Sequence, residues 1–450
     1  MMLPRTLRKF LSRMIEGAGG GPRGALLPML AAANRRLEAQ RHILSGRAAA
    51  IVVNTTVGSA IKNFIVTSAL IDGVTARSLH PNRAMAAALE DAFARFQDVA
   101  VLEGNMDLSA FTNLLLGSVI VTGEGIVRDV VTENGELRLQ QLQSEQLDDS
   151  RNEELADGGR IKRGIQTDAM GRIVGYWLHP NLDDTRTSRA SVFIPRDDVQ
   201  HVFEAVTPGQ QRGASWFTPA ITAIHAFDQL LDACIETAKT KALFTGFVKN
   251  LDGGSTVASD MAALQPMMPG AMVELPVGCD VTFAEPGDMS SLDSVLRASA
   301  RQICAAMGVP YEPIFDLSQT NYSSNKAGFE SFKRRVRVIR NMLTSRFLQP
   351  VWERFVTLEI LSGRIRAADY ARDPRAYFAA TWLWSEWASL EPLKEAQANA
   401  ILLQTGLASR QQLVEASGRE FAALQSEIDA DTFEPAPSNV VPITPATEAA

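Results

Sequence analysis

Large apolar side chains recur along this chain with two different periods. Between residues 83 and 97 they return every three or four positions, at Met85, Leu89, Phe93 and Phe96. That spacing places them on one face of an amphipathic helix. The same pattern predicts further helices over residues 107–118, 219–249, 290–307, 324–348 and 409–429, and one that begins near Pro392.

Between the helices predicted over residues 107–118 and 219–249, apolar side chains recur instead at every second position. Residues 125–131 and 136–142 alternate as strands do, and Asn134-Gly135 between them predicts a two-residue hairpin turn. Further short strands are predicted over residues 163–167, 173–178, 192–195 and 199–203. The sequence therefore predicts an α+β protein with a mixed α/β region of antiparallel hairpins.

Residues 250–289 differ from their surroundings, because they are rich in Gly, Pro and Met. They contain two short strand patterns, over residues 271–275 and 280–285, which Pro276-Val277-Gly278 separates. An insert of this size between two helices buries little apolar surface alone, so we expect it to pack against copies of itself.

A polar loop is predicted between the helix that ends near Gly308 and the helix that follows. Gly308 can close a helix in the left-handed conformation, and Pro310 prevents its continuation. Ser323 or Ser324 is a good N-cap for the next helix. The loop carries neither charge nor an aliphatic side chain, and its residues are Ser318, Gln319, Thr320, Asn321, Tyr322, Ser323 and Ser324.

The helix after this loop carries two stripes. The apolar stripe marks its buried face and consists of Phe329, Phe332, Val336, Ile339, Leu343 and Phe347. Lys326 precedes a basic stripe of Lys333, Arg337 and Arg340. Pro350 either ends this helix or begins a new one over residues 350–361.

Composition and charge narrow the functional classes. The 450 residues are 46% hydrophobic and 21% charged, with a formal net charge of −7, which disfavours a general basic binder of nucleic acids. Cys234, Cys279 and Cys304 show no zinc spacing, and their odd number and wide separation favour a reducing compartment. No run reaches the roughly 18 apolar residues of a membrane span, so no membrane association is expected.

Motifs for known chemistry are absent from the sequence. It contains no phosphate loop, no H-E-x-x-H, no C-x-x-C and no G-x-S-x-G. His201 lies in an apolar strand pattern and is interpreted as structural, while Asp148-Asp149 is interpreted as a solvated turn. We therefore expect no catalytic residue, metal ligand or cofactor, and a binding or structural protein rather than an enzyme.

Several ordered motifs resemble the portal proteins of tailed bacteriophages, of the lambda type. Together they span roughly residues 50–415, and their order is more specific than any one of them. The matching blocks are Gly123-Glu124-Gly125, Asp168 to Gly171 ahead of Val174 to Trp177, Pro208 to Gly213, Met307 to Glu312, Asn321 to Ser324 and Lys394-Glu395.

This resemblance implies a ring, usually of twelve subunits, at one vertex of a virion capsid. Double-stranded DNA would be packaged and ejected through it, with no enzymatic activity. The implied partners are copies of the chain, the terminase large subunit, major capsid and scaffold proteins, and a head-tail adaptor. Assembly would take place in the cytoplasm of the host bacterium.

The resemblance also implies a division of the chain. Its parts would be a peripheral segment (1–47), a wing (48–218 and 329–389), two stem helices (219–249 and 290–310), a small α/β clip (250–289), a tunnel loop region (311–328), a helical crown (390–431) and a disordered tail (432–450).

The predicted loop would then narrow a DNA channel. An uncharged surface suits that role, since each contact between a cation and a phosphate adds salt-dependent affinity that would impede sliding. Lys326, Lys333, Arg337 and Arg340 either guide phosphates weakly or form an interface or solvated face. Tyr322 either touches DNA or packs against the adjacent helix.

Two other hypotheses remain open at the level of sequence. The chain could be another ring-forming connector or adaptor of a virion. Less in keeping with the motifs, it could be a metal-dependent DNA-processing enzyme, which would require convergent Asp and Glu side chains.

Overall fold

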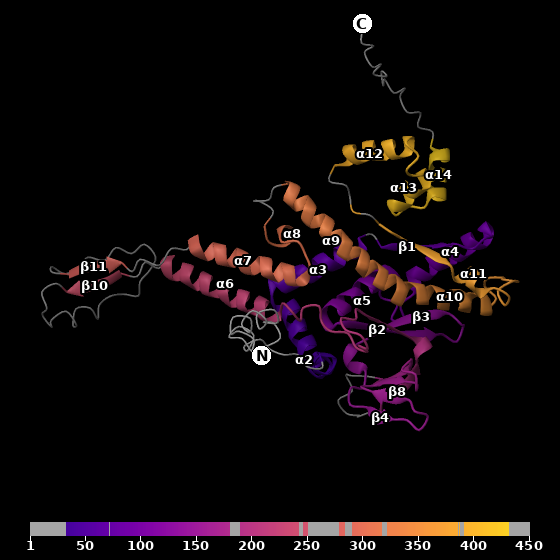
Figure 1. The fold of residues 1–450 in the computed structure, drawn as a ribbon, viewed down its shortest axis with the longest axis horizontal. Coiled ribbons are helices and arrows are strands. Elements are labelled where there is room, and N and C mark those ends of the chain that lie inside the picture. Colours follow the sequence, from indigo (N-terminus) through magenta and orange to yellow (C-terminus); the bar gives the residue numbers. More distant parts are fainter. Residues whose placement is uncertain are drawn as a thin grey trace, which may run out of the picture.

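The computed structural model describes residues 33–71, 73–180, 190–242, 246–250, 279–283, 290–316, 322–385, 387 and 391–431. As predicted, these residues form helices together with antiparallel sheets. Figure 1 shows a broad body that contains most of the strands. A pair of helices leaves this body as an arm, with two strands at its far end.

Two helices at the start of the described chain form a sharp corner. Helix α2 (Ala33–Asn54) and helix α3 (Thr56–Leu70) are bent by 98° relative to each other. Thr55 caps α3 by accepting a hydrogen bond from the Gly58 N–H at 3.1 Å. A Cβ atom at Gly58 would lie 2.6 Å from an Ile51 side-chain carbon, so only glycine lets the two helices approach this closely.

Within the described residues, no single helix is both long enough and apolar enough to cross a membrane. Only this bent pair of helices passes that test by length and composition.

The next two helices confirm the predicted amphipathic segments. Helix α4 (Arg83–Val99) begins at Asn82, whose side chain accepts from two backbone N–H groups. Helix α5 (Leu108–Thr122) begins after Asp107, whose side chain accepts from the Ala110 N–H, and ends at Gly123, with φ of 95°. Short polar side chains at the N-cap thus set where both helices start.

A three-stranded antiparallel sheet follows, in the order β3-β2-β9. Its strands are β2 (Glu124–Val131), β3 (Leu137–Leu142) and β9 (Val199–Phe203). The predicted two-residue turn is wrong, because the Thr132 N–H donates to the Glu136 carbonyl across a three-residue loop. In that loop Gly135 has φ of 73° while Asn134 does not have a positive φ, as expected of a turn closed by one left-handed residue.

A second sheet is a five-stranded antiparallel meander. Its strands are β4 (Asn152–Glu154), β5 (Arg160–Lys162), β6 (Ile165–Thr167), β7 (Ile173–Leu178) and β8 (Val192–Pro195). Two 3-10 turns flank it, Ser144–Gln146 and Arg196–Asp198. This sheet has its own small core of Ile126, Leu147, Ile165, Tyr176, Leu178 and Val199.

The arm consists of helix α6 (Ile221–Ala242) and helix α7 (Ser290–Met307). Strands β10 (Gly246–Asn250) and β11 (Cys279–Phe283) pair at its end. The prediction of one helix over residues 219–249 is therefore wrong at its C-terminal end. Helix α6 ends at Ala242, and residues 246–250 form a strand, to which Phe247 and Val248 are suited.

Strand β11 lies where one of the two strands of the insert was expected, and it pairs with β10. The other strand was expected over residues 271–275. The latter residues lie outside the described part of the chain.

The helix after the polar loop continues through Pro350. Helix α9 (Tyr322–Leu343) passes through a π-helical turn (Thr344–Leu348) into helix α10 (Gln349–Leu361). In this turn the Gln349 N–H donates to the Thr344 carbonyl, five residues earlier. The wider turn accommodates Pro350, which lacks an N–H and would crowd the carbonyl of Arg346 in a regular helix. Pro350 thus stands at the start of α10.

The C-terminal part adds one strand and several short helices. Strand β1 (Val74–Ser78) pairs with β12 (Ala380–Trp384), which follows helix α11 (Pro374–Phe378). Helix α12 (Pro392–Gln404) confirms the start near Pro392. The single helix predicted over residues 409–429 is two, α13 (Arg410–Ala416) and α14 (Phe421–Ala430), because Gly418 takes a φ of 79° between them. Residues 432–450 lie outside the described part.

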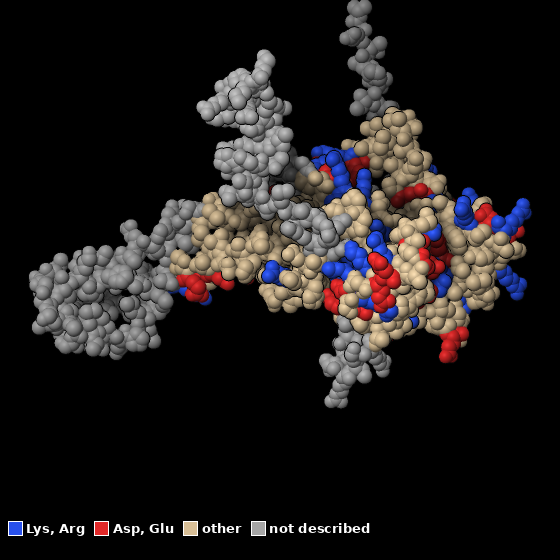
Figure 2. Space-filling model, turned by 60° about the horizontal axis from the view of Figure 1, so that its bottom comes forward, with Lys and Arg blue, Asp and Glu red and all other residues tan. Residues whose placement is uncertain are grey.

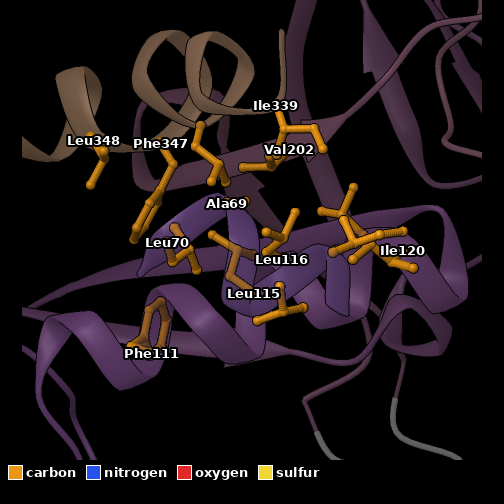
Figure 3. Close-up of a cluster of buried hydrophobic side chains, with 14 of the residues drawn as sticks. Ala69, Leu70, Phe111, Leu115, Leu116, Ile120, Val202, Ile339, Phe347 and Leu348 are labelled. Atoms are coloured by element: carbon orange, nitrogen blue, oxygen red, sulfur yellow. The ribbon is translucent and has the colours of Figure 1, made fainter. Parts of the chain in front are cut away.

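The main core joins elements that are distant in sequence. The predicted apolar face of α9 is confirmed, since Phe332, Val336, Ile339, Leu343 and Phe347 are buried, whereas Phe329 is partly exposed. Figure 3 shows this face against α3, α5 and β9, with labelled side chains of Ala69, Leu70, Phe111, Leu115, Leu116, Ile120, Val202, Ile339, Phe347 and Leu348.

One buried carboxyl of strand β2 opposes folding at neutral pH. Burial raises the pKa of Asp129 to about 6, although a hydrogen bond from Gln200 at 3.1 Å and the charge of Arg354 both act to lower it. The folded chain therefore binds more protons than the unfolded chain between pH 3.8 and about 6, so stability falls as pH rises through that range.

We expect Asp129→Asn to raise the free energy of unfolding by about 1–3 kcal/mol at pH 7 and to bring no gain near pH 4. Urea unfolding at the two pH values checks this. Asp197→Asn is the matched control, since that side chain is 88% exposed and should change stability by less than about 0.5 kcal/mol. A destabilised Asp129→Asn variant at pH 7 would contradict the prediction.

Candidate nucleic-acid interface

Helix α7 ends just before the predicted loop in a well-formed Schellman motif. The Val309 N–H donates to the Cys304 carbonyl at 3.0 Å, and the Gly308 N–H donates to the Ala305 carbonyl at 3.3 Å. Gly308 takes the left-handed conformation with φ of 67°, as its place in the sequence predicted. The chain therefore leaves α7 in a fixed direction.

A one-turn helix, α8 (Glu312–Phe315), follows and was not predicted. The Tyr311 and Phe315 rings stack at 5.3 Å, and Phe315 also meets Phe227 of α6 edge-on at 5.8 Å. The Arg301 guanidinium lies over the Tyr311 ring at 5.3 Å. Four residues are too few to show a helical period, so only these tertiary contacts define α8.

The predicted loop is shorter than expected at its C-terminal end. Ser318, Gln319, Thr320 and Asn321 lie outside the described residues, whereas Tyr322, Ser323 and Ser324 form the first turn of α9. The prediction that a serine at 323 or 324 precedes the helix is therefore wrong. Serine and tyrosine have helix propensities close to those of most polar residues, so they can occupy a first turn.

The two sides of this loop come close together. Gly328 of α9 lies beside Pro310, where an added Cβ atom would stand 3.8 Å from the proline side chain. The second turn of α9 and the turn that follows α7 are therefore neighbours in the structure.

Lys326 has an anionic partner in its own chain. Its ammonium lies 3.2 Å from a carboxylate oxygen of Glu391, the residue that precedes α12. The lysine side chain is 52% exposed. Its charge is therefore largely balanced near the loop.

The predicted basic stripe of α9 is divided by the structure. Lys333 pairs with Glu330 at 3.1 Å on the exposed face, and Arg337 is exposed. Arg340 instead donates to the backbone carbonyls of Ala69 and Ser385, each at 2.8 Å. Arg340 is therefore bound within the subunit, whereas Lys333 and Arg337 lie on the exposed side of α9.

Three further arginines attach α9 and α10 to strand β9 and the turn before it. Arg335 binds Glu204 through two hydrogen bonds of 2.7 and 2.6 Å, which is the bidentate geometry of a strong pair. Arg346 lies over the Phe203 ring at 4.6 Å, and Arg354 donates to Asp198 at 2.8 Å. These contacts position the long helix along the edge of the three-stranded sheet.

Strand β9 also carries one side of a buried ionic cluster around Glu124. Glu124 has no exposed side-chain surface and accepts from Arg212 at 2.5 Å, from His201 at 3.1 Å and from the Ser144 hydroxyl at 2.5 Å. Arg41 of helix α2 donates to it at 3.2 Å. Four chain segments therefore converge on one carboxylate.

The second acid of this cluster is Asp149. It pairs with Arg212 and accepts from Arg41 at 3.3 Å. Its neighbour Asp148 is mostly buried and accepts from the Ser191 hydroxyl at 2.7 Å. The interpretation of Asp148-Asp149 as a solvated turn is therefore wrong. Residues 1–47 are also not wholly peripheral, because Arg41 is buried.

The cluster holds its charges in place. Burial alone would raise the pKa of the Glu124 carboxyl, but the Arg212 guanidinium and His201 hold that pKa well below its usual range. Burial lowers the pKa of the His201 imidazole despite the adjacent carboxylate. His201 is thus a neutral ring that donates to Glu124 from Nε2, as the interpretation of a structural histidine implied.

On the face of the molecule that Figure 2 shows, positive charges are not gathered into one patch. Figure 2 shows Lys and Arg mixed with Asp and Glu over the visible body, and few charges along the described part of the arm. Among the residues that the structure describes, no group of three or more His, Cys, Asp or Glu side chains could hold a metal ion.

Comparison with known proteins places this chain in one protein family. The family model described as "Phage portal protein, lambda family" matches residues 21–340. A protein from Halomonas phage phiHAP-1 named "Probable portal protein" is 25% identical over 313 residues, which cover 65% of this chain and 59% of that protein. Portal protein B of Escherichia phage lambda is 23% identical over 315 residues, which cover 62% of this chain and 59% of the relative.

The chain thus matches about three fifths of the length of these two relatives. Among solved structures, a chain of "Neck of empty GTA particle computed with C6 symmetry" superposes with a TM-score of 0.51 at 14% identity. The superposition covers 83% of this chain and 93% of that chain, so the two share a fold.

Proposed function

This chain belongs to the lambda family of phage portal proteins, and we propose that it forms a ring-shaped channel at one vertex of a capsid. Double-stranded DNA would enter through the ring during packaging and leave through it on ejection. The mixed α+β fold and the arm of two helices support this proposal, together with the shared fold of the neck chain.

We assign the parts of the portal to the observed elements. Helices α6 and α7 are the stem, and the two-stranded ribbon at the end of the arm belongs to the clip. The clip then begins at Gly246 rather than at residue 250, because β10 is one of its strands. The body around the main core is the wing, and α12 to α14 are the crown.

We propose that residues 317–321, together with the first turn of α9, line the narrowest part of the channel. The observation that carries this assignment is the fixed geometry on both sides, where the Schellman motif of α7 and the contact of Gly328 with Pro310 define the ends. Ser318 to Asn321 offer hydrogen bonds without charge, which lets phosphates pass without tight binding.

The partners follow from the same role. We propose that copies of this chain close the ring, a dodecamer, and that the terminase large subunit docks on it during packaging. Capsid and scaffold proteins would surround it, and a head-tail adaptor would follow in the mature virion, after assembly in the bacterial cytoplasm.

Deletion of residues 318–321 should leave ring assembly intact and impair the packaging or retention of DNA. The deletion spares Tyr322 to Ser324, because these belong to α9. Electron microscopy of the purified protein counts rings, and nuclease protection of DNA in assembled particles measures retention.

A four-residue deletion of 181–184, between β7 and β8, is the matched control and should leave DNA retention unchanged. A protein that stays monomeric under assembly conditions would contradict the portal assignment. Rings that package and retain DNA normally without residues 318–321 would contradict only the assignment of the loop.

A further inference from the structure

Four described residues from the end of strand β12 to the start of helix α12 contact α9 and are here called the strap: Trp384, Ser385, Trp387 and Glu391. It leaves strand β12 and leads to helix α12, the first helix of the C-terminal unit α12–α14 (Figure 1). Its contacts follow α9 backwards, toward the loop.

The first contact of the strap is with Arg340. The Arg340 side chain donates to the Ser385 carbonyl at 2.8 Å and lies over the Trp384 ring at 5.3 Å. It also donates to the Ala69 carbonyl at 2.8 Å, so it joins the strap, α9 and the end of α3. This point is a fixed anchor.

The second contact is an aromatic cluster nearer the loop. Trp387 meets Phe329 edge-on at 5.7 Å and Phe332 at 5.8 Å, and its indole N–H donates to the Ser68 carbonyl at 3.0 Å. Phe332 also stacks on Phe64 at 5.0 Å. Aromatic groups of this size dominate local packing, so Trp387 holds the second and third turns of α9 against α3.

The third contact lies in the first turns of α9. Glu391 binds Lys326 at 3.2 Å and Lys394 of α12 at 2.5 Å. Exposed pairs contribute little stability. Their geometry nevertheless brings the start of α12 beside the start of α9, five residues after the loop.

The C-terminal unit also contacts the strap. Between α13 and α14, Gly418 approaches so closely that an added Cβ atom would lie 2.8 Å from the Ser385 Cα and from the Trp384 carbonyl oxygen. Glu415 of α13 also pairs with Arg77 of β1. Helices α12 and α13 contain no buried residue, so this unit rests on the body through few contacts.

We propose that the strap sets the position of the first turns of α9 and transmits displacement of the C-terminal unit to them. Trp387 is the central positioning residue, since it alone of the described strap residues contacts two aromatic side chains of α9. A shift of the Gly418 turn would move the strap, and the strap would move the turns of α9 that follow the loop. The identification of the loop as part of a DNA channel rests on the proposed function. The coupling between the C-terminal unit and α9 does not.

Hydrogen–deuterium exchange of the assembled protein tests the positioning role. Trp387→Ala should raise amide exchange over residues 322–335 by about tenfold or more, while Trp387→Phe should raise it less. Trp177→Ala is the matched control, because Trp177 is also half-buried and its indole N–H donates to Gln166 at 3.1 Å in a separate sheet. Unchanged exchange over 322–335 in Trp387→Ala would overturn the proposal.

A second pair of variants tests transmission. Gly418→Ala should also raise exchange over 322–335, by about threefold or more, although Gly418 approaches the backbone of Trp384 and Ser385 rather than α9 itself. Gly406→Ala carries a similar conformational strain, since φ is 71° there against 79° at Gly418, but an added Cβ atom meets nothing within 4 Å. Equal effects of the two substitutions on 322–335 would overturn transmission through the strap.

Electron microscopy of the same samples separates this inference from the proposed function. If the unmodified protein forms no rings, the portal assignment fails whatever the exchange shows. If Trp387→Ala rings keep their diameter and lose protection only over 322–335, the strap positions the first turns of α9 within an intact assembly.

Discussion

Glu124→Gln should lower the free energy of unfolding by about 3–5 kcal/mol at pH 7. The substitution keeps the shape of the side chain but removes the charge that compensates Arg212 and Arg41, whose side chains are 2% and 5% exposed. Both guanidinium groups would then depend on Asp149, whose side chain is 38% exposed, and a buried charge with so little compensation is costly. Urea unfolding followed by circular dichroism measures the change.

The pH dependence of this effect has a definite sign. The pKa of Glu124 is lowered in the folded chain, so its contribution is present above the ordinary value of 4.5 and is lost as pH falls through the folded pKa. The difference between the wild type and Glu124→Gln should therefore shrink in acid.

Glu136→Gln is the matched control in the same hairpin. Glu136 pairs with Arg138 while 43% exposed, and its loss should cost less than about 1 kcal/mol. If Glu124→Gln were as stable as Glu136→Gln, the cluster would not contribute to folding in the way its burial implies.

Trp352→Ala should cost about 3–5 kcal/mol, the largest effect that we expect from the hydrophobic core. Trp352 is fully buried in α10 and meets Phe93 edge-on at 5.1 Å. Its removal leaves a cavity that the helices around it can fill only in part.

Trp352→Phe should cost clearly less than Trp352→Ala. The indole N–H of Trp352 is buried without a hydrogen-bond partner, so phenylalanine loses volume but also removes an unsatisfied donor. Leu361→Ala, on the same helix and 72% exposed, should change stability by less than about 0.5 kcal/mol. Equal losses for Trp352→Ala and Leu361→Ala in thermal unfolding would contradict this account.

The sequence predicts elements well where one physical signal dominates. The helices after Asn82 and Asp107 have both a capping side chain and an apolar period, and both form as expected. Predicted boundaries of helices and strands are wrong where the sequence signal is weak or fits both kinds of element. Residues 246–250 continue an apolar run without a proline, so their change from helix to strand depends on pairing with residues 279–283.

The candidate interface was predictable only in outline. Gly308 and Pro310 indicate where α7 ends, but nothing local indicates that Arg340 turns inward toward Ala69 and Ser385. Helix periodicity places a residue on a face, and only the partner elements decide whether that face meets solvent.

The buried ionic cluster could also be predicted from the sequence only in part. Glu124 stands between two glycines at the start of an apolar strand, and His201 lies inside another apolar strand. A charged or titratable residue within an apolar run is the signal that could have indicated burial. Its partners Arg41 and Arg212 lie 83 and 88 residues from Glu124, so the pairing itself needs the fold.

The π-helical turn at Thr344–Leu348 constrains the length of the chain. A π turn holds one residue more than a regular turn, and each residue rotates a helix by about 100°. Loss of one exposed residue such as Ser345 would therefore convert the π turn to a regular turn and leave Val351, Trp352 and Phe355 near the positions that they now fill, but it would bring Pro350 against a helical carbonyl. Among related chains, a one-residue deletion at this point should therefore accompany replacement of Pro350.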